Sequence, residues 1–202
     1  MANLFVIAAP SGCGKTSLVK ALIEKTEALC VSVSHTTRVA RPGEIHGKNY
    51  FFVSKEAFKQ INAENGFIES AQVFDNYYGS AKQTVKDLLE KGQDVILEID
   101  WQGARQVGQS FPNLISIFIL PPSVEALRER LTNRGQDDSS IVERRMKDAV
   151  SEMQHYDEFD YLVINDDFDV ALNDLSAIIH SQRLNFQYQT NKYHDLLKTL
   201  IA

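Results

Sequence analysis

Residues 9–16, which read APSGCGKT, carry the groups that bind nucleotide phosphates. In the pattern G-x-x-x-x-G-K-[ST], glycines let backbone N–H groups turn toward a phosphate, lysine reaches the β- and γ-phosphate oxygens, and the last hydroxyl binds Mg²⁺. The chain supplies these groups in Gly12, Gly14, Lys15 and Thr16. Ala9 stands where the first glycine is expected, and its methyl group is compatible with a backbone of negative φ. The stretch predicts a phosphate-binding loop.

An ordinary glycine turn before a helix has a similar composition, so the flanking sequence decides between the two interpretations. An apolar run at residues 4–7 precedes the turn, and Leu18 and Leu22 follow it at helical spacing. The order strand, loop, helix is the context that a phosphate loop requires, and the positive end of the helix then points at the same anion. We therefore expect a buried strand, the loop and a helix that ends near Glu27.

A second candidate group lies at the end of the apolar run 94–100. Strand periodicity places Glu98 and Asp100 on the same face. At the carboxyl end of a buried strand near a phosphate loop, Asp100 is placed to hold Mg²⁺ with Thr16, directly or through water. Aspartate is also a common helix N-cap, and a helix is expected to begin near Trp101. Capping is therefore the alternative role of Asp100.

Arginines are concentrated between residues 128 and 145: Arg128, Arg130, Arg134, Arg144 and Arg145. Arg130 and Arg134 are four residues apart on an expected helix, where like charges repel unless an anion lies between them. The alternative is a solvated face paired with acids such as Glu129 and Glu143. Beside a phosphate loop, we favour a helical lid that closes over phosphate.

The elements that position these residues alternate between strand and helix. Strands are expected over residues 31–34, 49–53, 67–73, 76–80, 94–100 and 114–120, and a last strand with a turn over residues 161–167. Helices are expected from near residues 54, 81, 101, 123, 140 and 168, the last two ending near 156 and 188. Short strands between residues 31 and 80 predict a small, mostly antiparallel lobe inserted into an α/β chain. The residues after about Leu184 form a helical tail that packs either on the core or on a second copy of the chain.

Composition limits the class of protein. The 202 residues suit one compact domain, and no run approaches a membrane span of about 18 apolar residues. The start of the chain lacks a basic signal segment, so the expected location is cytoplasmic. Cys13 and Cys30 are too few for a disulfide framework and are expected to be reduced. A net charge of −6 argues against a nucleic acid polymer as partner and favours a small polyanionic ligand.

Several further motifs follow one another along the chain: Ser34–Arg38, Arg41–Glu44, Gly47–Phe52, Asn76–Ser80, Ile99–Ala104, Arg130-Leu131 with Arg134-Gly135, and Asn165-Asp166. In this order, they closely resemble the motifs of the guanylate kinase family, and of its bacterial, cytoplasmic type in particular. Together with the phosphate loop, they cover the chain from Leu4 to about Arg183. The resemblance is therefore far more specific than the loop alone.

The resemblance implies an α/β, P-loop nucleoside monophosphate kinase fold, with a parallel central sheet flanked by helices, a small mixed β lobe that binds GMP, and a helical lid. It divides the single domain into a core (1–33, 91–123 and 157–202), a GMP-binding lobe (34–90) and a lid (124–156). The implied activity is Mg²⁺-dependent transfer of the ATP γ-phosphoryl group to GMP, and also to dGMP, within purine nucleotide metabolism and GMP recycling. The implied partners are ATP and GMP, with no nucleic acid polymer and no membrane, and a homo-oligomer is left open.

The resemblance also assigns residues to roles. The phosphate of GMP is held by Arg38, Arg41, Tyr50 and Tyr78, and the guanine edge is read by Ser34, Glu69 and Ser80. Asp100, a metal candidate with Thr16, is also expected to face GMP. The transferred phosphoryl group is stabilised by Lys15, Arg130, Arg134 and Arg145. ATP contacts Ala9, Pro10, Ser11, Gly12, Cys13, Gly14, Lys15 and Thr16, and Asn165 lies near its adenine.

The chemistry of guanine agrees with the role of Glu69. One carboxylate can accept the adjacent N1–H and N2–H₂ donors of guanine, whereas adenine presents no such pair. A buried charge left unpaired by AMP costs several kcal/mol, which can discriminate about 10⁴-fold between GMP and AMP.

Two other functions remain: a kinase for another phosphorylated acceptor, such as ribose bisphosphate, and a non-catalytic interaction module. A kinase for another acceptor would need no acid that recognises guanine. The intact Gly14, Lys15 and Thr16 argue against a non-catalytic module.

Overall fold

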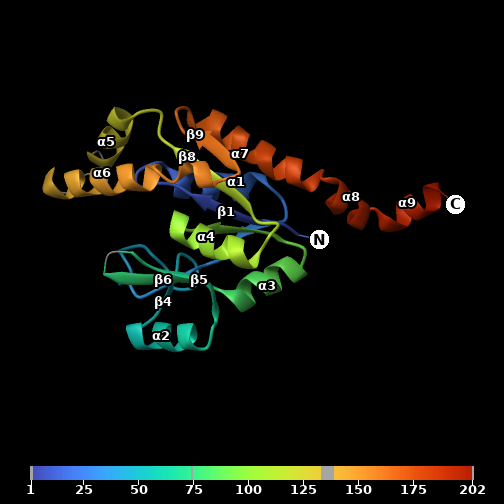
Figure 1. Cartoon of the computed structure of the whole chain (residues 1–202), viewed down its shortest axis with the longest axis horizontal. Helices are drawn as coiled ribbons and strands as arrows, with labels where there is room; N and C mark the ends of the chain where they lie inside the picture. Colours follow the sequence, from blue (N-terminus) through green and yellow to red (C-terminus); the bar gives the residue numbers. More distant parts are fainter. Residues whose placement is uncertain (1, 74, 133–138, 202) are drawn as a thin grey trace.

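The computed structural model describes residues 2–73, 75–132 and 139–201. Its centre is a five-stranded parallel sheet in the order β2-β7-β1-β8-β9. These strands are β1 (Leu4–Ala8), β2 (Leu29–Val31), β7 (Asp94–Glu98), β8 (Ile115–Leu120) and β9 (Tyr161–Ile164). A small lobe and a helical lid extend from one side of this core, and a C-terminal arm extends from the other (Figure 1). The predicted α/β class is confirmed.

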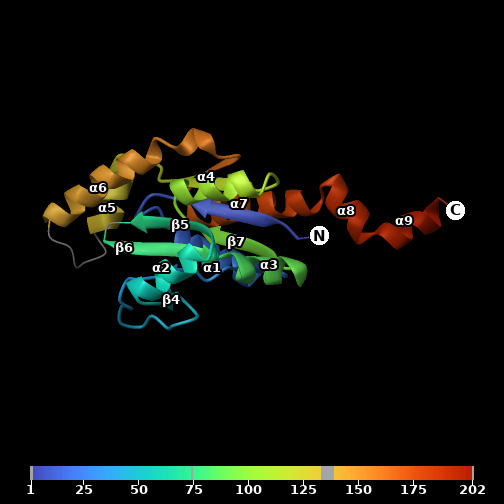
Figure 2. The ribbon, with the colours of Figure 1, turned by 60° about the horizontal axis from the view of Figure 1, so that its bottom comes forward.

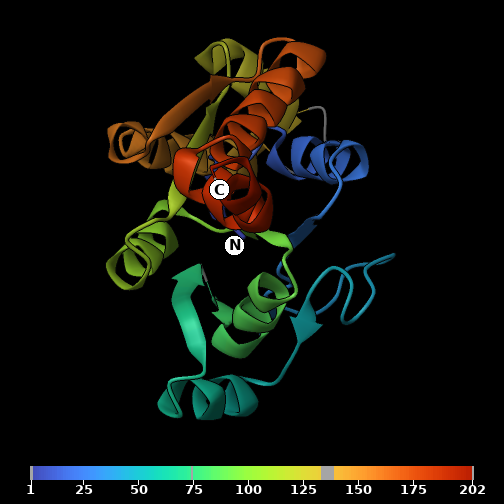
Figure 3. The same cartoon turned by 90° about the vertical axis from the view of Figure 1, so that its right-hand side faces the viewer.

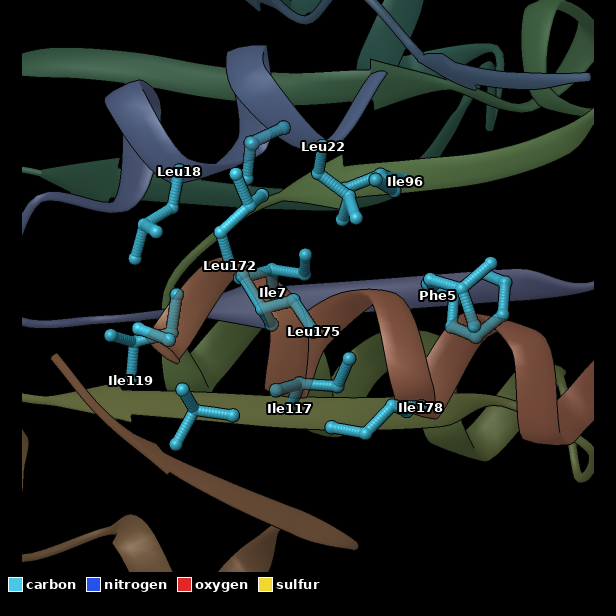
Figure 4. Packing of buried hydrophobic residues seen from close by; sticks show 14 of the residues in the cluster. Phe5, Ile7, Leu18, Leu22, Ile96, Ile117, Ile119, Leu172, Leu175 and Ile178 are labelled. Atoms are coloured by element: carbon cyan, nitrogen blue, oxygen red, sulfur yellow. The ribbon is translucent and has the colours of Figure 1, made fainter. Parts of the chain in front are cut away.

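The central sheet is buried on both faces, which explains why its strands read as continuous apolar runs. Phe5 and Ile7 pack against α1 (Lys15–Lys25) and α7 (Phe168–Arg183), as Figure 4 shows. Leu4 and Val6, which point to the opposite face, pack against α3 (Lys82–Glu90) and α4 (Trp101–Ser110). Full burial of such a side chain contributes roughly 1.5–3 kcal/mol. The core therefore fixes the strand ends that carry the site.

The small lobe has its own mixed sheet, in the order β4-β3-β6-β5, with helix α2 (Lys55–Ala63) beside it (Figure 3). Its strands are β3 (His35–Thr36), β4 (Phe51–Phe52), β5 (Phe67–Val73) and β6 (Asn76–Ala81). Strands β3 and β4 run parallel, and the other pairs are antiparallel. The predicted strand over residues 31–34 is wrong in its bounds. Its first residue ends β2 in the central sheet, and the chain then crosses to β3 in the small lobe.

The lid consists of α5 (Val124–Thr132) and α6 (Ser139–Met153), which project beside the small lobe (Figure 2). Leu127 and Leu131 of α5 pack against Val142 and Met146 of α6. The long helix ends before the predicted Tyr156, because a 3₁₀ turn (Tyr156–Glu158) follows it. This end of the lid is attached to the core by His155, whose ring stacks on Trp101 with centroids 3.6 Å apart.

The last helix of the core is shorter than predicted. It ends at Arg183 rather than near Tyr188, and Asn185 accepts hydrogen bonds from two backbone N–H groups that begin a new helix. Helices α8 (Phe186–Lys192) and α9 (His194–Leu200) form the C-terminal arm, which points away from the core (Figure 1). Among the described residues, no helix combines the length and apolar character needed to cross a bilayer.

Candidate active site

A cavity of about 890 Å³ opens where the phosphate loop, the small lobe and the lid meet. Many of the predicted site residues line it: Ala9, Pro10, Ser11, Gly12, Gly14, Lys15, Thr16, Ser34, Arg41, Tyr50, Glu69, Tyr78, Asp100 and Arg145. Charged residues that the sequence interpretation did not assign to the site also line it, namely the acids Asp75, Glu98, Asp148 and Glu152 and the base Arg144. The predicted donor and acceptor groups therefore share one cavity.

The phosphate loop has the backbone that its motif requires. Gly12 and Gly14 have φ values of 95° and 86°, which L side chains rarely adopt. The described non-glycine residues with positive φ are Ala28 and Asn65, so Ala9 has the negative φ that its methyl group requires.

Cys13 is fully buried against the lid, and burial raises the pKa of its thiol to about 12. Its side chain is therefore a packing group, and only its backbone is available to a ligand.

The polar groups after the loop meet the end of β7. Lys15 Nζ donates to the carbonyl oxygen of Ile99 at 3.4 Å, and Thr16 Oγ1 donates to Glu98 Oε2 at 3.5 Å. Asp100 Oδ1 accepts a hydrogen bond of 2.8 Å from the N–H of Gly103, so Asp100 caps α4 while it lines the cavity. The alternative capping role is therefore observed. Glu98, on the same strand face, is the acid that contacts Thr16.

The lid reaches the loop through arginines. Arg145 Nη2 donates to Ser11 Oγ at 2.8 Å, and Arg130 Nη2 donates to the carbonyl oxygen of Asn165 at 2.9 Å. Arg130 Nη1 is buried with no hydrogen-bond partner among the described residues, so it keeps a donor for an anion. Arg128 instead pairs with Glu143 on the solvent side, as the solvated-face alternative predicts. Arg134 lies outside the described residues.

Cys13 and Asn165, two predicted ligands of ATP, do not line the cavity but bind each other. Asn165 is buried, and its Nδ2 donates a hydrogen bond of 2.7 Å to the carbonyl oxygen of Cys13, which holds the loop in place. A contact of Asn165 with adenine stays a prediction.

The guanine-reading residues lie together in the small lobe. Glu69 of β5 is 4 % exposed and pairs in register with Ser80 of β6, whose side chain and backbone both hydrogen-bond to its carboxyl group. Ser80 Oγ lies 3.2 Å from Ser34 Oγ. Burial, with a smaller effect of Asp100, raises the pKa of Glu69 to about 7. With this pKa, the carboxyl group of Glu69 gains or loses its proton near neutral pH.

The predicted ligands of the acceptor phosphate form a second cationic group. Arg38 Nη2 donates to Glu44 Oε1 at 2.7 Å, and the Arg38 guanidinium lies 5.5 Å from the centre of the Tyr50 ring. The rings of Tyr50 and Tyr78 meet edge to face with centroids 6.0 Å apart. Arg41 lines the cavity, and its backbone N–H donates to Glu44 Oε2. Glu44 thus organises both arginines without lining the cavity itself.

A parallel α/β core with a phosphate loop at its strand ends, facing a second cationic group across one cavity, defines a P-loop phosphotransferase that acts on a phosphorylated acceptor. The family model described as "Guanylate kinase" matches residues 1–182. The chain belongs to the guanylate kinase family.

Individual relatives agree with this assignment. The guanylate kinase of Saccharophagus degradans is 56% identical over 200 residues, which cover 99% of this chain and 98% of that protein. The guanylate kinase of Methylococcus capsulatus is 54% identical, with 98% of each protein covered. Curated relatives at this identity along the whole chain make it a kinase that phosphorylates GMP to GDP with ATP.

Solved structures show the same fold. The crystal structure of guanylate kinase from Anaplasma phagocytophilum matches with a TM-score of 0.77 and 34% identity, covering 92% of this chain and 88% of that chain. The SH3-kinase fragment of tight junction protein 3 matches with a TM-score of 0.50 at 14% identity, covering 90% of this chain and 57% of that chain, and it shows a likeness of fold alone.

Proposed function

We propose that the cavity holds ATP with its triphosphate on the loop at residues 9–16 and GMP in the lobe at residues 34–90, so that the γ-phosphoryl group passes directly between them. The observation that carries this division is the position of Glu69, a buried acid that opens into the same cavity as Lys15 and Arg145. One face of the cavity therefore has a carboxyl group that can recognise the guanine base, and the other face has cations that can bind phosphates.

The transfer needs positioning and positive charge more than proton removal. A phosphate monoester has a second pKa of about 6, so the attacking oxygen of GMP is largely ionised at neutral pH. We assign the stabilisation of the moving phosphoryl group to Lys15, Arg130 and Arg145, together with Arg134, and each such arginine can contribute about 10³-fold or more. Arg130 Nη1 has no hydrogen-bond partner within the described ranges, and Arg145 contacts Ser11; both observations support these roles. The lid at residues 124–156 closes to exclude water, which is the competing acceptor.

Acceptor choice rests on Glu69, Ser34 and Ser80. The ionised carboxylate of Glu69 accepts both N–H donors of guanine, and its serine neighbours keep it oriented. Arg38, Arg41, Tyr50 and Tyr78 bind the acceptor phosphate, with Arg38 held ready by Glu44. Because these contacts go to base and phosphate, we propose that dGMP is accepted as well as GMP.

Hard oxygen donors at the strand end fit Mg²⁺. Thr16 Oγ1 and Glu98 Oε2 lie 3.5 Å apart, and Asp100 has one carboxylate oxygen beyond its capping bond. We propose that Thr16, Glu98 and Asp100 hold the ion, directly or through water. When bound, Mg²⁺ neutralises charge on the β- and γ-phosphates.

A coupled assay of ADP formation with GMP, dGMP, AMP and ribose bisphosphate tests the proposal. We expect rapid turnover with GMP and dGMP, and turnover with AMP lower by about 10⁴-fold. Faster turnover with the sugar phosphate would establish the alternative acceptor. An absence of turnover with every acceptor would establish the non-catalytic alternative.

We further propose that the enzyme works in the cytoplasm, in purine nucleotide metabolism and the recycling of GMP. Both of its cysteines are free thiols, which fits a reducing compartment.

We also propose that the C-terminal arm mediates self-association. Phe186, Leu200 and Ile201 are 80%, 70% and 86% exposed, and large apolar side chains grouped on a projecting arm are typical of an interface. Light scattering of the whole chain should show a dimer or larger species. The double variant Leu196→Glu, Leu200→Glu should be monomeric, and a monomeric wild-type chain would contradict the proposal.

A further inference from the structure

Helix α4 of the core is joined to strand β5 of the small lobe by the side chain of Gln106. The helix lies beside this lobe in Figure 1. The backbone N–H of Ser70 donates to Gln106 Oε1 at 3.0 Å, and Gln106 Nε2 donates to the carbonyl oxygen of Ser70 at 3.0 Å. One side chain thus binds both backbone groups of the residue that directly follows Glu69. The contact therefore fixes the backbone of β5 beside this buried acid.

Strand β5 lies at the edge of the four-stranded sheet of the lobe, so its pairing with β6 has to hold it from one side. This pairing shifts between Phe67 and Glu69. A shift of this kind disrupts the ladder of hydrogen bonds locally and changes the direction of the side chains next to it. On the other side of the strand, the amide of Gln106 supplies the donor and the acceptor that a neighbouring strand would offer.

The carboxyl group of Glu69 lies against the same face of α4. A Cβ atom at Gly103 would be 3.1 Å from Glu69 Oε2, which is closer than side chains ordinarily approach. The N–H of Gly103 donates to Asp100 Oδ1, the cap of the helix. Gly103 and Gln106 are three residues apart, which places them on one face of the helix. The missing side chain at Gly103 therefore leaves space for the carboxyl group.

We infer that Gly103 and Gln106 position Glu69 for guanine, Gln106 by holding the backbone of β5 and Gly103 by leaving room for the carboxyl group. This inference rests on the proposed function, because it needs Glu69 to accept the N–H groups of guanine. A carboxylate that accepts two donors at once must be held within about 0.5 Å of the right place, and neighbouring contacts provide that precision. Neither Gly103 nor Gln106 lines the cavity, so both act through Glu69.

The variant Gln106→Ala removes both hydrogen bonds to Ser70, and a comparison of GMP with inosine monophosphate (IMP) shows whether Glu69 has moved. IMP has the N1–H donor of GMP but lacks the N2 amino group, so it needs only one of the two bonds. By calorimetry, we expect the Kd of GMP to rise about 10-fold and the Kd of IMP by less than about 3-fold. The Kd of a non-hydrolysable ATP analogue should stay within about 2-fold of wild type. Equal weakening of GMP and IMP would mean that the whole lobe is loosened, and the inference would be wrong.

The variant Gly103→Ala tests the same positioning without removing a hydrogen bond. Alanine favours a helix more than glycine does, so the substitution does not weaken α4 itself. The added methyl group would press on Glu69 Oε2, and we expect the Kd of GMP to rise about 5-fold and the Kd of IMP by less than about 2-fold. The methyl group would also meet Ile99 Cδ1 at 3.1 Å. A disturbance of the core at Ile99 would weaken GMP and IMP alike, and that result would contradict the inference.

Helix α4 offers a matched control for each variant. Gly108→Ala adds a methyl group with nothing within 4 Å of it, and Gln109→Ala truncates an exposed glutamine. Both controls should leave the Kd of GMP within about 2-fold of wild type. An effect of either control as large as that of its partner at Gly103 or Gln106 would overturn the inference, because any change of α4 would then suffice.

A double-mutant cycle shows whether Gln106 acts through Glu69. In a Glu69→Gln background, Gln106→Ala should change the Kd of GMP by less than about 2-fold, because the group that it positions is already altered. A 10-fold effect in that background would contradict the inference.

The same measurements separate this inference from the proposed function. Equal Kd values of GMP in wild type and Glu69→Gln would contradict the reading of guanine by Glu69. A weakened Glu69→Gln together with wild-type Kd values in Gln106→Ala and Gly103→Ala would contradict the positioning role alone.

Discussion

The side-chain amide of Asn165 donates a buried hydrogen bond of 2.7 Å to the carbonyl oxygen of Cys13, which joins the residue after β9 to the phosphate loop. The backbone carbonyl of Asn165 accepts from Arg130 Nη2, and its N–H donates to the carbonyl oxygen of Leu120. One buried residue thus connects the sheet, the loop and the lid. The geometry of the phosphate loop is therefore set partly by packing outside it.

This contact predicts a large effect of Gly14→Ala. A methyl group at Gly14 would lie 2.5 Å from Asn165 Nδ2, and the residue has a φ of 86°. We expect the free energy of unfolding, measured in urea, to fall by about 2–4 kcal/mol. The affinity for ATP should fall with it, because the loop must shift.

Gly92→Ala is the matched control, since Gly92 has a φ of 77° with nothing within 4 Å of the added methyl group. It should cost only about 1 kcal/mol, which is the penalty of the backbone conformation alone. In an Asn165→Ala background, Gly14→Ala should cost less than in the wild type, because the atom that it meets is gone. Equal costs at Gly14 and Gly92 would show that the contact with Asn165 does not matter.

Lys15→Met should abolish turnover and spare the acceptor site. Lys15 stands at the start of α1 with its ammonium group in the cavity, where it is placed to neutralise the transferred phosphoryl group. We expect kcat to fall by about 10³-fold or more, and the Kd of GMP to stay within about 2-fold of wild type. Lys20→Met, on an exposed turn of the same helix, should leave both values unchanged. Preserved turnover in Lys15→Met would refute the assigned role.

Glu69→Gln should weaken the preference for GMP over AMP. The amide offers one acceptor oxygen and an NH₂ group that repels a guanine donor, so one hydrogen bond is lost and one clash is created. We expect kcat/KM for GMP to fall by about 10²- to 10⁴-fold, with a much smaller change for AMP. Parallel initial rates with the two nucleotides provide the measurement, and unchanged rates with both would remove Glu69 from base recognition.

The parts of the site that local sequence determines were predictable. The glycines, Lys15 and Thr16 follow from one motif, because backbone angle and helix start are set within a few residues. The alternation of side chains along the strand at residues 94–100 places Glu98 and Asp100 on the same face. The sequence interpretation assigned only Asp100 to the metal, and it therefore missed the contact of Glu98 with Thr16.

Other features depend on long-range packing and could not be predicted. Glu152 lies more than a hundred residues from Ser11, and nothing in the periodicity of α6 shows which turn will face the loop. The apolar alternation at residues 31–34 spans the crossing between two sheets, so strand propensity alone could not locate the break. The end of α7 at Arg183 depends on its hydrogen bonds to Asp94 and to the carbonyl oxygen of Glu27, which no local pattern contains.

The raised pKa of Glu69 predicts a pH-dependent stability of the nucleotide-free chain. The ordinary pKa is 4.5, and the folded value is about 7, so the folded state holds the proton more tightly than the unfolded state does. Stability from this group is therefore full below pH 4.5 and is lost as pH rises toward 7, by at most about 3 kcal/mol. Urea titrations from pH 5 to 8 should show the loss in wild type and a smaller loss in Glu69→Gln. Parallel curves for the two proteins would contradict the assignment.

The same pKa predicts that GMP binds more tightly as pH rises. Guanine donors need the ionised carboxylate of Glu69, and with a pKa of about 7 this form grows about tenfold between pH 6 and pH 8. The second ionisation of the GMP phosphate, with a pKa of about 6, falls in the same range and affects every variant alike. The Kd of GMP is therefore measured by calorimetry at each pH for the wild type and for Glu69→Gln, and the two proteins are compared. We expect the wild-type affinity to gain about tenfold more than that of the variant, and equal gains would mean that guanine binding is not linked to the charge of Glu69.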